Sequence, residues 1–145
     1  MRAKPVLRVS AKLLIPFILL FALYVQFHGD FGPGGGFQAG VIFAAGFILY
    51  ALIFGVSNAQ AALPPASRRW LMGGGVLLYA GVGVAGMLAG GNYLDYSVLG
   101  ETPTGGQHLG VFLVELGVGM NVFASVATIF FVFAGRDVRR GEGGR

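Results

Sequence analysis

One acidic residue lies inside a long apolar segment, and its position makes it the residue best placed to do chemistry. Glu115 falls within the apolar stretch 109–134, away from both of its ends. A charged side chain at the centre of a membrane-spanning helix costs roughly 2.5–3.5 kcal/mol, so such residues are rare and usually functional. Because apolar surroundings favour the neutral form of a carboxyl group, Glu115 is a candidate carrier of protons.

Two further residues share a helix face with this acid. His108 precedes Glu115 by seven residues and Gly119 follows it by four, spacings that place all three on one side of a helix. The pattern indicates a polar stripe that leads inward from His108 to Glu115. Three interpretations stay open. Glu115 could carry protons or ions itself, or it could line an ion path that is formed mainly by partner subunits. It could also be a neutral or paired glutamate that only stabilises helix packing.

A glycine-rich turn is the second feature with chemical potential. It consists of Pro33, Gly34, Gly35, Gly36 and Phe37. Free backbone amides at the start of a helix favour anions, but a phosphate-binding loop needs a lysine after its last glycine, and none is present here. We therefore expect no ATP site. A packed turn that lets a neighbouring segment approach is the simpler interpretation, and an ion-lining element is the alternative. His28 and Asp30 flank the turn and form a weak candidate cation site at its mouth.

The composition excludes most other chemistry. The chain has no cysteine and only two histidines, which leaves no thiolate zinc site and no iron–sulfur ligation. No nucleophile lies in a pattern with a base, and no paired carboxylates occur. The sequence therefore predicts no catalytic residue, no bound cofactor and no metal, and a chain that is not an enzyme. The net charge of +4 does not indicate nucleic-acid binding, because the basic residues cluster at helix ends.

The elements that must position these residues are membrane-spanning helices. Hydrophobic residues make up 55% of the chain, and residues 31–67 and 70–94 carry no charge at all. About 20 apolar residues suffice to span a bilayer. We predict an all-α integral membrane protein: a single membrane domain over residues 1–145, folded as a small helical bundle. Its expected spans are approximately 6–27, 37–56, 70–90 and 109–134, with a basic tail at 136–145.

The charges predict the orientation of this bundle. In a four-span arrangement all ten lysines and arginines fall on one side, whereas the loops of the other side carry Asp30, Asp95 and Glu101. Basic loops remain in the cytoplasm. We therefore expect both termini to be cytoplasmic and the glycine-rich turn to lie on the outer side.

Small residues indicate close helix packing. Gly81 and Ala85 form one stripe of the third span, and Gly86 and Gly90 form another beside it. In lipid, such residues allow helix backbones to approach each other. The stripes could serve packing within the bundle or docking onto a larger complex. Asn121, near the middle of the fourth span, is expected to hydrogen-bond a neighbouring helix.

Three motifs together resemble those of a known family. The segment from His28 to Gly40 contains the glycine-rich turn, the fourth span contains Glu115-Leu-Gly-Val118, and Gly135-Arg136-Asp137 closes that span. With the length and the four-span layout, they resemble the MnhB/MrpB-type component of the Mrp/Mnh cation/proton antiporters over essentially the whole chain. The chain departs from the pattern at Ala39, where members often have glycine, and at Glu115, where they often have aspartate.

The resemblance implies a subunit of a multi-subunit complex that exchanges Na⁺ for protons across the bacterial plasma membrane. Its implied partners are the large antiporter-like subunits, several small membrane subunits and the surrounding lipid. Related subunits of the same type also occur in ion-translocating membrane-bound hydrogenases, so that host complex is the alternative. A purely structural scaffold subunit and an independent small transporter remain further hypotheses.

Overall fold

The structure is a computed structural model that describes residues 5–29 and 32–142, and from residue 136 onward it describes the backbone alone. Its elements are α1 (Pro5–Phe27), α2 (Gly36–Phe54), α3 (Val56–Ala62), α4 (Pro65–Leu88), the 3₁₀ helix η1 (Tyr96–Leu99) and α5 (Pro103–Glu142). The helices α1, α2 and α4 and the Pro103–Gly135 part of α5 are long and apolar enough to cross a membrane. The predicted all-α class with four spanning helices is confirmed, and the described ranges contain no strand.

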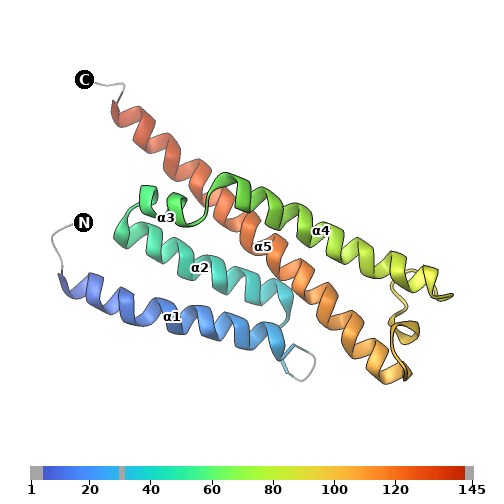
Figure 1. The fold of residues 1–145 in the computed structure, drawn as a ribbon. Coiled ribbons are helices and arrows are strands. Elements are labelled where there is room, and N and C mark those ends of the chain that lie inside the picture. The colour runs from blue at the N-terminus through green and yellow to red at the C-terminus, as the bar shows by residue number, and fades with distance from the viewer. Residues whose placement is uncertain (1–4, 30–31, 143–145) are drawn as a thin grey trace.

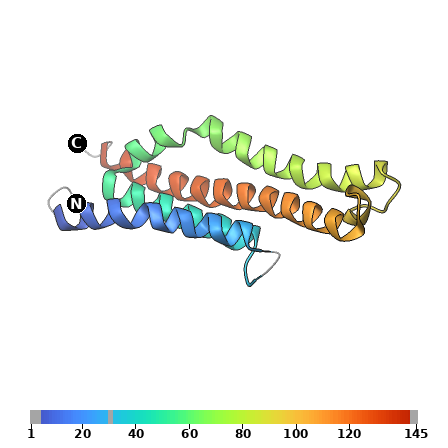
Figure 2. The ribbon, with the colours of Figure 1, turned by 60° about the horizontal axis from the view of Figure 1, so that its bottom comes forward.

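The long helix α5 organises the bundle (Figure 1). It packs against α4 on one side and α2 on the other, and α1 packs mainly against α2. The helices therefore follow one another in the order α1, α2, α5, α4 (Figure 2). This order places the face of α5 that carries Glu115 against the first two helices of the chain.

Glycines bring the helix backbones into contact. A methyl group at Gly75 of α4 would lie 2.5 Å from the carbonyl oxygen of Gly117, and one at Gly117 would lie 2.8 Å from the oxygen of Gly75. Gly40 of α2 makes a similar approach to the carbonyl oxygen of Gly119, at 2.7 Å. The Asn121 side chain donates a hydrogen bond to the Met72 carbonyl oxygen on α4, at 3.2 Å. The expected interhelical hydrogen bond of Asn121 is therefore confirmed.

Some helix limits differ from those expected. The helix α2 ends at Phe54, and the next residue, Gly55, has a φ of 103° that favours glycine. A short helix α3 that the sequence did not predict follows it. The helix α4 begins at Pro65, because proline suits the first helical position, where its missing N–H is not needed. The helix α5 runs from residue 103 to 142, past both ends of the stretch 109–134. Here too a proline, Pro103, stands at the helix start.

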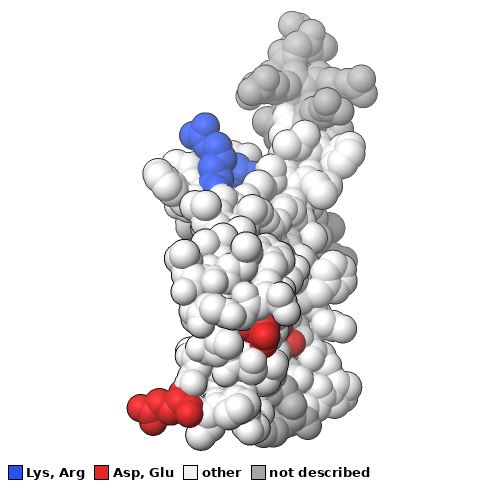
Figure 3. All heavy atoms as spheres, turned by 90° about the vertical axis from the view of Figure 1, so that its right-hand side faces the viewer, with Lys and Arg blue, Asp and Glu red and all other residues white. Residues whose placement is uncertain are grey.

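Among the residues coloured in Figure 3, the lysines and arginines lie at one end of the molecule, whereas the acids lie at the opposite end and between the two. At the end where α2 meets α3, the Arg68 guanidinium stacks over the Phe131 ring at 4.7 Å, and Arg8 lies 5.6 Å from the centre of the Phe54 ring. We call this the basic end. The opposite, acidic end contains the loop between α4 and α5, with Asp95 and Glu101.

Local contacts order the loop at the acidic end. The Asp95 carboxylate accepts hydrogen bonds from the hydroxyl and the backbone N–H of Ser97, at 2.5 and 3.2 Å. These bonds hold the pKa of Asp95 below its ordinary value. The rings of Tyr93 and Tyr96 fill the space beside Gly83 and Gly110, where an added methyl group would displace them. The loop is therefore a packed cap on α4 and α5.

The four helices do not end at one level. At the acidic end α1 and α2 stop well short of α4 and α5 (Figure 2). The last residue of α1, Phe27, stacks its ring on that of Phe112 at 5.7 Å. Because α5 starts at Pro103, it extends roughly 14 Å beyond this contact, at about 1.5 Å per residue. The connection between α1 and α2 thus lies beside the middle part of α5.

Candidate functional site

The carboxyl group of Glu115 lies against the connection between α1 and α2. Its Oε2 atom contacts Gly29, which follows the end of α1, and a methyl group at Gly35 would lie 2.6 Å from its Oε1 atom. The side chain as a whole is half-buried. The acid and the glycine-rich turn form a single site, although Gly35 and Glu115 are 80 residues apart in the sequence.

Each glycine near the acid meets a different part of Glu115. At Gly35 and Gly29 an added methyl group would meet the end of the carboxylate side chain, which can rotate away. At Gly36, the first residue of α2, it would meet the Glu115 backbone, 2.7 Å from the carbonyl carbon and 3.0 Å from Cα. Gly36 therefore sets the approach of α2 to α5, whereas Gly35 and Gly29 leave room for the carboxylate.

This site lies close to the middle of the α4–α5 pair. The apolar span of α5, Pro103–Gly135, has its midpoint at Gly119. The midpoint of α4 lies just after Gly75, and Gly75 contacts Gly117 and Asn121 of α5. Glu115 is four residues from Gly119, so the turn lies about 6 Å from the common midpoint, at about 1.5 Å per residue.

The two residues expected to share the face of Glu115 have different surroundings. Gly119 is buried, and a methyl group there would lie 2.5 Å from Oε1 of Gln26 and 3.2 Å from the Gly36 carbonyl oxygen. His108 is exposed, on the part of α5 that extends past α1 and α2 toward the acidic end. Glu115 and Gly119 thus meet the first two helices, and His108 lies beyond them.

The other residues of the turn and its flanks lie around this contact. Gly34 has a φ of 125°, which favours glycine, while Pro33 and Phe37 are exposed. The His28 ring stacks on that of Tyr24, with 5.1 Å between the ring centres. Asp30 lies outside the described residues. Within the described parts of the chain, no three His, Asp or Glu side chains gather as a metal site.

The small residues singled out on α4 divide into two groups. Gly86 is buried, and a methyl group there would lie 3.0 Å from the Asp95 carbonyl oxygen. Gly81, Ala85 and Gly90 are exposed. The contact between α4 and α5 instead uses Gly75, which the stripe pattern had not indicated.

Gln26 is a site residue that the sequence analysis missed. It is only 6% exposed, and its side-chain oxygen lies against Gly119, one turn from Glu115. A glutamine one residue from the end of an apolar helix is normally expected to face water or headgroups. Its burial follows from the level at which α1 ends, which hydropathy does not report.

Comparisons with known proteins identify the family to which the sequence is similar. The family model described as "Domain related to MnhB subunit of Na+/H+ antiporter" matches residues 6–128. Proteins of Staphylococcus aureus strains Newman and COL, both named "Putative antiporter subunit mnhB2", are 35% identical to this chain over 133 residues. The matched region covers 90% of this chain and 94% of each relative. The stretch matched by the family model includes both the glycine-rich turn and Glu115.

Proposed function

The chain belongs to the family of MnhB-related domains, and from that premise we propose that it is a non-catalytic membrane subunit of a multi-subunit Na⁺/H⁺ antiporter. In this proposal it contributes to assembly and lines part of the ion path. Its partners are the large antiporter-like subunits and the other small membrane subunits, and the complex lies in the bacterial plasma membrane. The basic end, with both termini, faces the cytoplasm.

The observation that carries the ion-path part of the proposal is the position of the Glu115 carboxyl group. It lies against Gly29 and Gly35, near the midpoint of the α4–α5 pair. The carboxyl group faces the irregular backbone of the glycine-rich turn, and an acid inside a spanning helix is usually functional.

We propose that water reaches Glu115 from the acidic end. The helices α1 and α2 stop at the level of Phe112, so the first turns of α5 extend beyond them. His108 is exposed on this projecting part of α5. An aqueous route past His108 to Glu115 gives the acid access to one side of the membrane, where it exchanges protons.

Replacement of the acid tests this role. Glu115→Gln keeps the shape of the side chain but removes its proton exchange, so Na⁺/H⁺ exchange in everted vesicles that contain the complete complex should be abolished. Glu115→Asp, which restores the acid that members of the resembling family often have, should retain exchange. Glu101→Gln is the matched control, because Glu101 is an exposed acid of the loop at the acidic end. Normal exchange by an assembled Glu115→Gln complex would refute the ion-path role.

Purification tests complex membership separately. The tagged chain should be recovered from native membranes together with large antiporter-like subunits, identified by mass spectrometry. Recovery with hydrogenase subunits, or recovery of this chain alone as an oligomer, would contradict the antiporter assignment.

A further inference from the structure

The Gln26 side chain is buried and incompletely hydrogen-bonded. It is 6% exposed, and its Nε2 atom has no hydrogen-bond partner among the residues that the structure describes. Its oxygen, by contrast, lies close to Gly119 of α5. A buried N–H donor without an acceptor destabilises a protein, so such groups usually have a functional reason.

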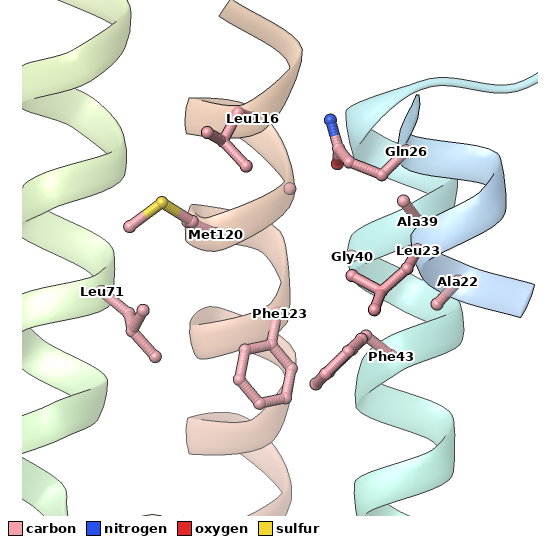
Figure 4. A pocket seen from close by; sticks show the side chains of 11 residues that line it. Ala22, Leu23, Gln26, Ala39, Gly40, Phe43, Leu71, Leu116, Met120 and Phe123 are labelled. Carbon is pink, nitrogen blue, oxygen red and sulfur yellow. The ribbon is translucent and has the colours of Figure 1, made fainter. Parts of the chain in front are cut away.

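This amide lies at a cavity that is otherwise apolar and is partly open to the outside of the helical bundle. Figure 4 shows Gln26 extending from α1 toward α5, on one side of a space bounded by α4, α5, α2 and α1. The cavity has a volume of about 240 Å³, and Gln26 is the only one of its lining residues with a polar side chain. Leu116, Met120 and Phe123 line the side of the cavity that α5 forms (Figure 4).

Gln26 and Glu115 lie one above the other in the contact between α5 and the first two helices. Gly29, three residues after Gln26 in the chain, contacts the Glu115 carboxylate, and Gly119, four residues after Glu115, contacts the Gln26 oxygen. One helical turn, about 5.4 Å, therefore separates the two levels along α5. Gln26 is thus a polar side chain one helical turn from Glu115, on the side toward the basic end.

The chemistry of the unpaired group decides which ligand suits it. A bare cation is disfavoured because Nε2 is a donor, and a lipid tail has no acceptor to offer. A water molecule has one, and it needs two to four polar partners to be held in a cavity. The polar atoms nearest to a methyl position at Gly119 are the Gln26 oxygen and the Gly36 carbonyl oxygen, at 2.5 and 3.2 Å, and they are the acceptors at hand for the hydrogens of this water. The cavity is also far larger than one water, which occupies roughly 30 Å³ in the liquid.

We infer that Gln26 binds water in this cavity and that this water relays protons between Glu115 and the basic-end half of the protein. The neutral carboxyl group of Glu115 gives its proton to the bound water, which releases another of its protons to the next water and stays neutral. Glu115 is left as a carboxylate and is reprotonated from the acidic end, or the sequence runs in reverse. The inference rests on the proton-exchanging role proposed for Glu115.

Three variants separate a water ligand from a packing residue. Gln26→Met keeps length and volume but has no donor, so exchange by the complete complex should fall at least tenfold. Because the lost donor has no partner among the described protein groups, assembly and thermal stability should be unchanged or improved. Gln26→Glu, neutral when protonated, keeps an O–H donor and should retain exchange. Met120→Leu changes an apolar residue of the same cavity and is the matched control.

Two results of this series would overturn the inference. Full exchange by Gln26→Met, in a complex that Glu115→Gln inactivates, would refute the role of Gln26 and leave that of Glu115 intact. Loss of the assembled complex in Gln26→Met would identify the amide as a structural group. Normal exchange by Glu115→Gln would instead refute the proposed function itself.

Cryo-electron microscopy of the complete complex tests the ligand directly. A map that resolves ordered waters should show density within hydrogen-bonding distance of Gln26 Nε2, inside the cavity. A hydrogen bond from Nε2 to an acceptor of another protein in the complex, or a cavity filled by a lipid tail, would overturn the inference.

Discussion

Replacing Gly35 by alanine tests whether the position of the Glu115 carboxyl group matters for exchange. The residue precedes α2 with an extended backbone, φ −178°, which alanine also adopts. The new methyl group would lie 2.6 Å from Oε1 and 3.3 Å from Cδ of Glu115. Because these atoms form the end of a flexible side chain, the carboxyl group can move while the helices keep their places.

The contact distances give the size of the displacement. Ordinary van der Waals contacts of such a methyl group begin at 3.4 Å, so the oxygen at 2.6 Å must retreat by 0.8 Å. A misplacement of about 1 Å can cost a reacting group up to roughly 10²-fold in rate. We therefore expect Gly35→Ala to lower the rate of Na⁺/H⁺ exchange by about 10- to 100-fold, with the complex assembled in normal amounts.

Two other glycines provide controls. At Gly73 of α4 an added methyl group meets nothing within 4 Å, so Gly73→Ala should leave exchange and assembly unchanged. At Gly36 it would meet the Glu115 backbone, which cannot rotate away. Overpacking of that kind typically costs about 1–3 kcal/mol. Gly36→Ala should therefore lower the thermal stability and the amount of complex, unlike Gly35→Ala.

The assay is exchange in everted vesicles, normalised to the amount of complex on a native gel. If Gly35→Ala complexes assemble and exchange Na⁺ for protons at the parent rate, the position of the Glu115 carboxyl group against the glycine-rich turn has no part in transport. If Gly35→Ala and Gly36→Ala lose assembly equally, the distinction between a movable side chain and a fixed backbone is wrong.

Two further predictions concern the helix contact and the loop at the acidic end. Asn121→Leu removes the hydrogen bond to the Met72 carbonyl oxygen and should lower the free energy of unfolding in detergent by roughly 0.6–1.7 kcal/mol; an unchanged unfolding curve would show that this bond adds nothing. Ser97→Ala removes the hydroxyl that helps to lower the pKa of Asp95. A lowered carboxyl pKa stabilises the folded state above the unfolded value of about 3.9, and that contribution is lost as the pH falls through the lowered value. The melting temperature of Ser97→Ala should therefore lie below that of the parent near neutral pH and converge with it in acid, and a constant difference would contradict the charge-based explanation.

Hydropathy and charge predicted the elements because those properties are local. A stretch of about 20 apolar residues can hardly be anything but a spanning helix in a chain with so few charges. The short helix α3 was missed because seven residues carry no clear periodicity. The helix α4 starts at Pro65, before the expected span 70–90, because proline suits the first helical position and hydropathy does not report that preference.

The site was predictable only in part, because hydropathy and composition report local properties and not contacts between helices. Glu115 could be found because a lone acid in an apolar span is costly, and the glycine-rich turn because its composition is unusual. Gln26 could not be found, because one polar residue near the end of a span normally indicates an interface with water or headgroups. Its burial depends on how far α5 extends beyond α1, which no local pattern encodes.

The sequence by itself determined the membrane class, the four spans, the acid within the last span and the resemblance to the antiporter subunits. These follow from the transfer of side chains from water to lipid, which each segment undergoes independently, and from motifs that can be read in the chain directly. Only the tertiary structure decided that the glycine-rich turn lies against Glu115 near the midpoint of α4 and α5. That contact depends on the stagger of the helices, which the close approaches at Gly36, Gly40, Gly75 and Gly117 fix jointly.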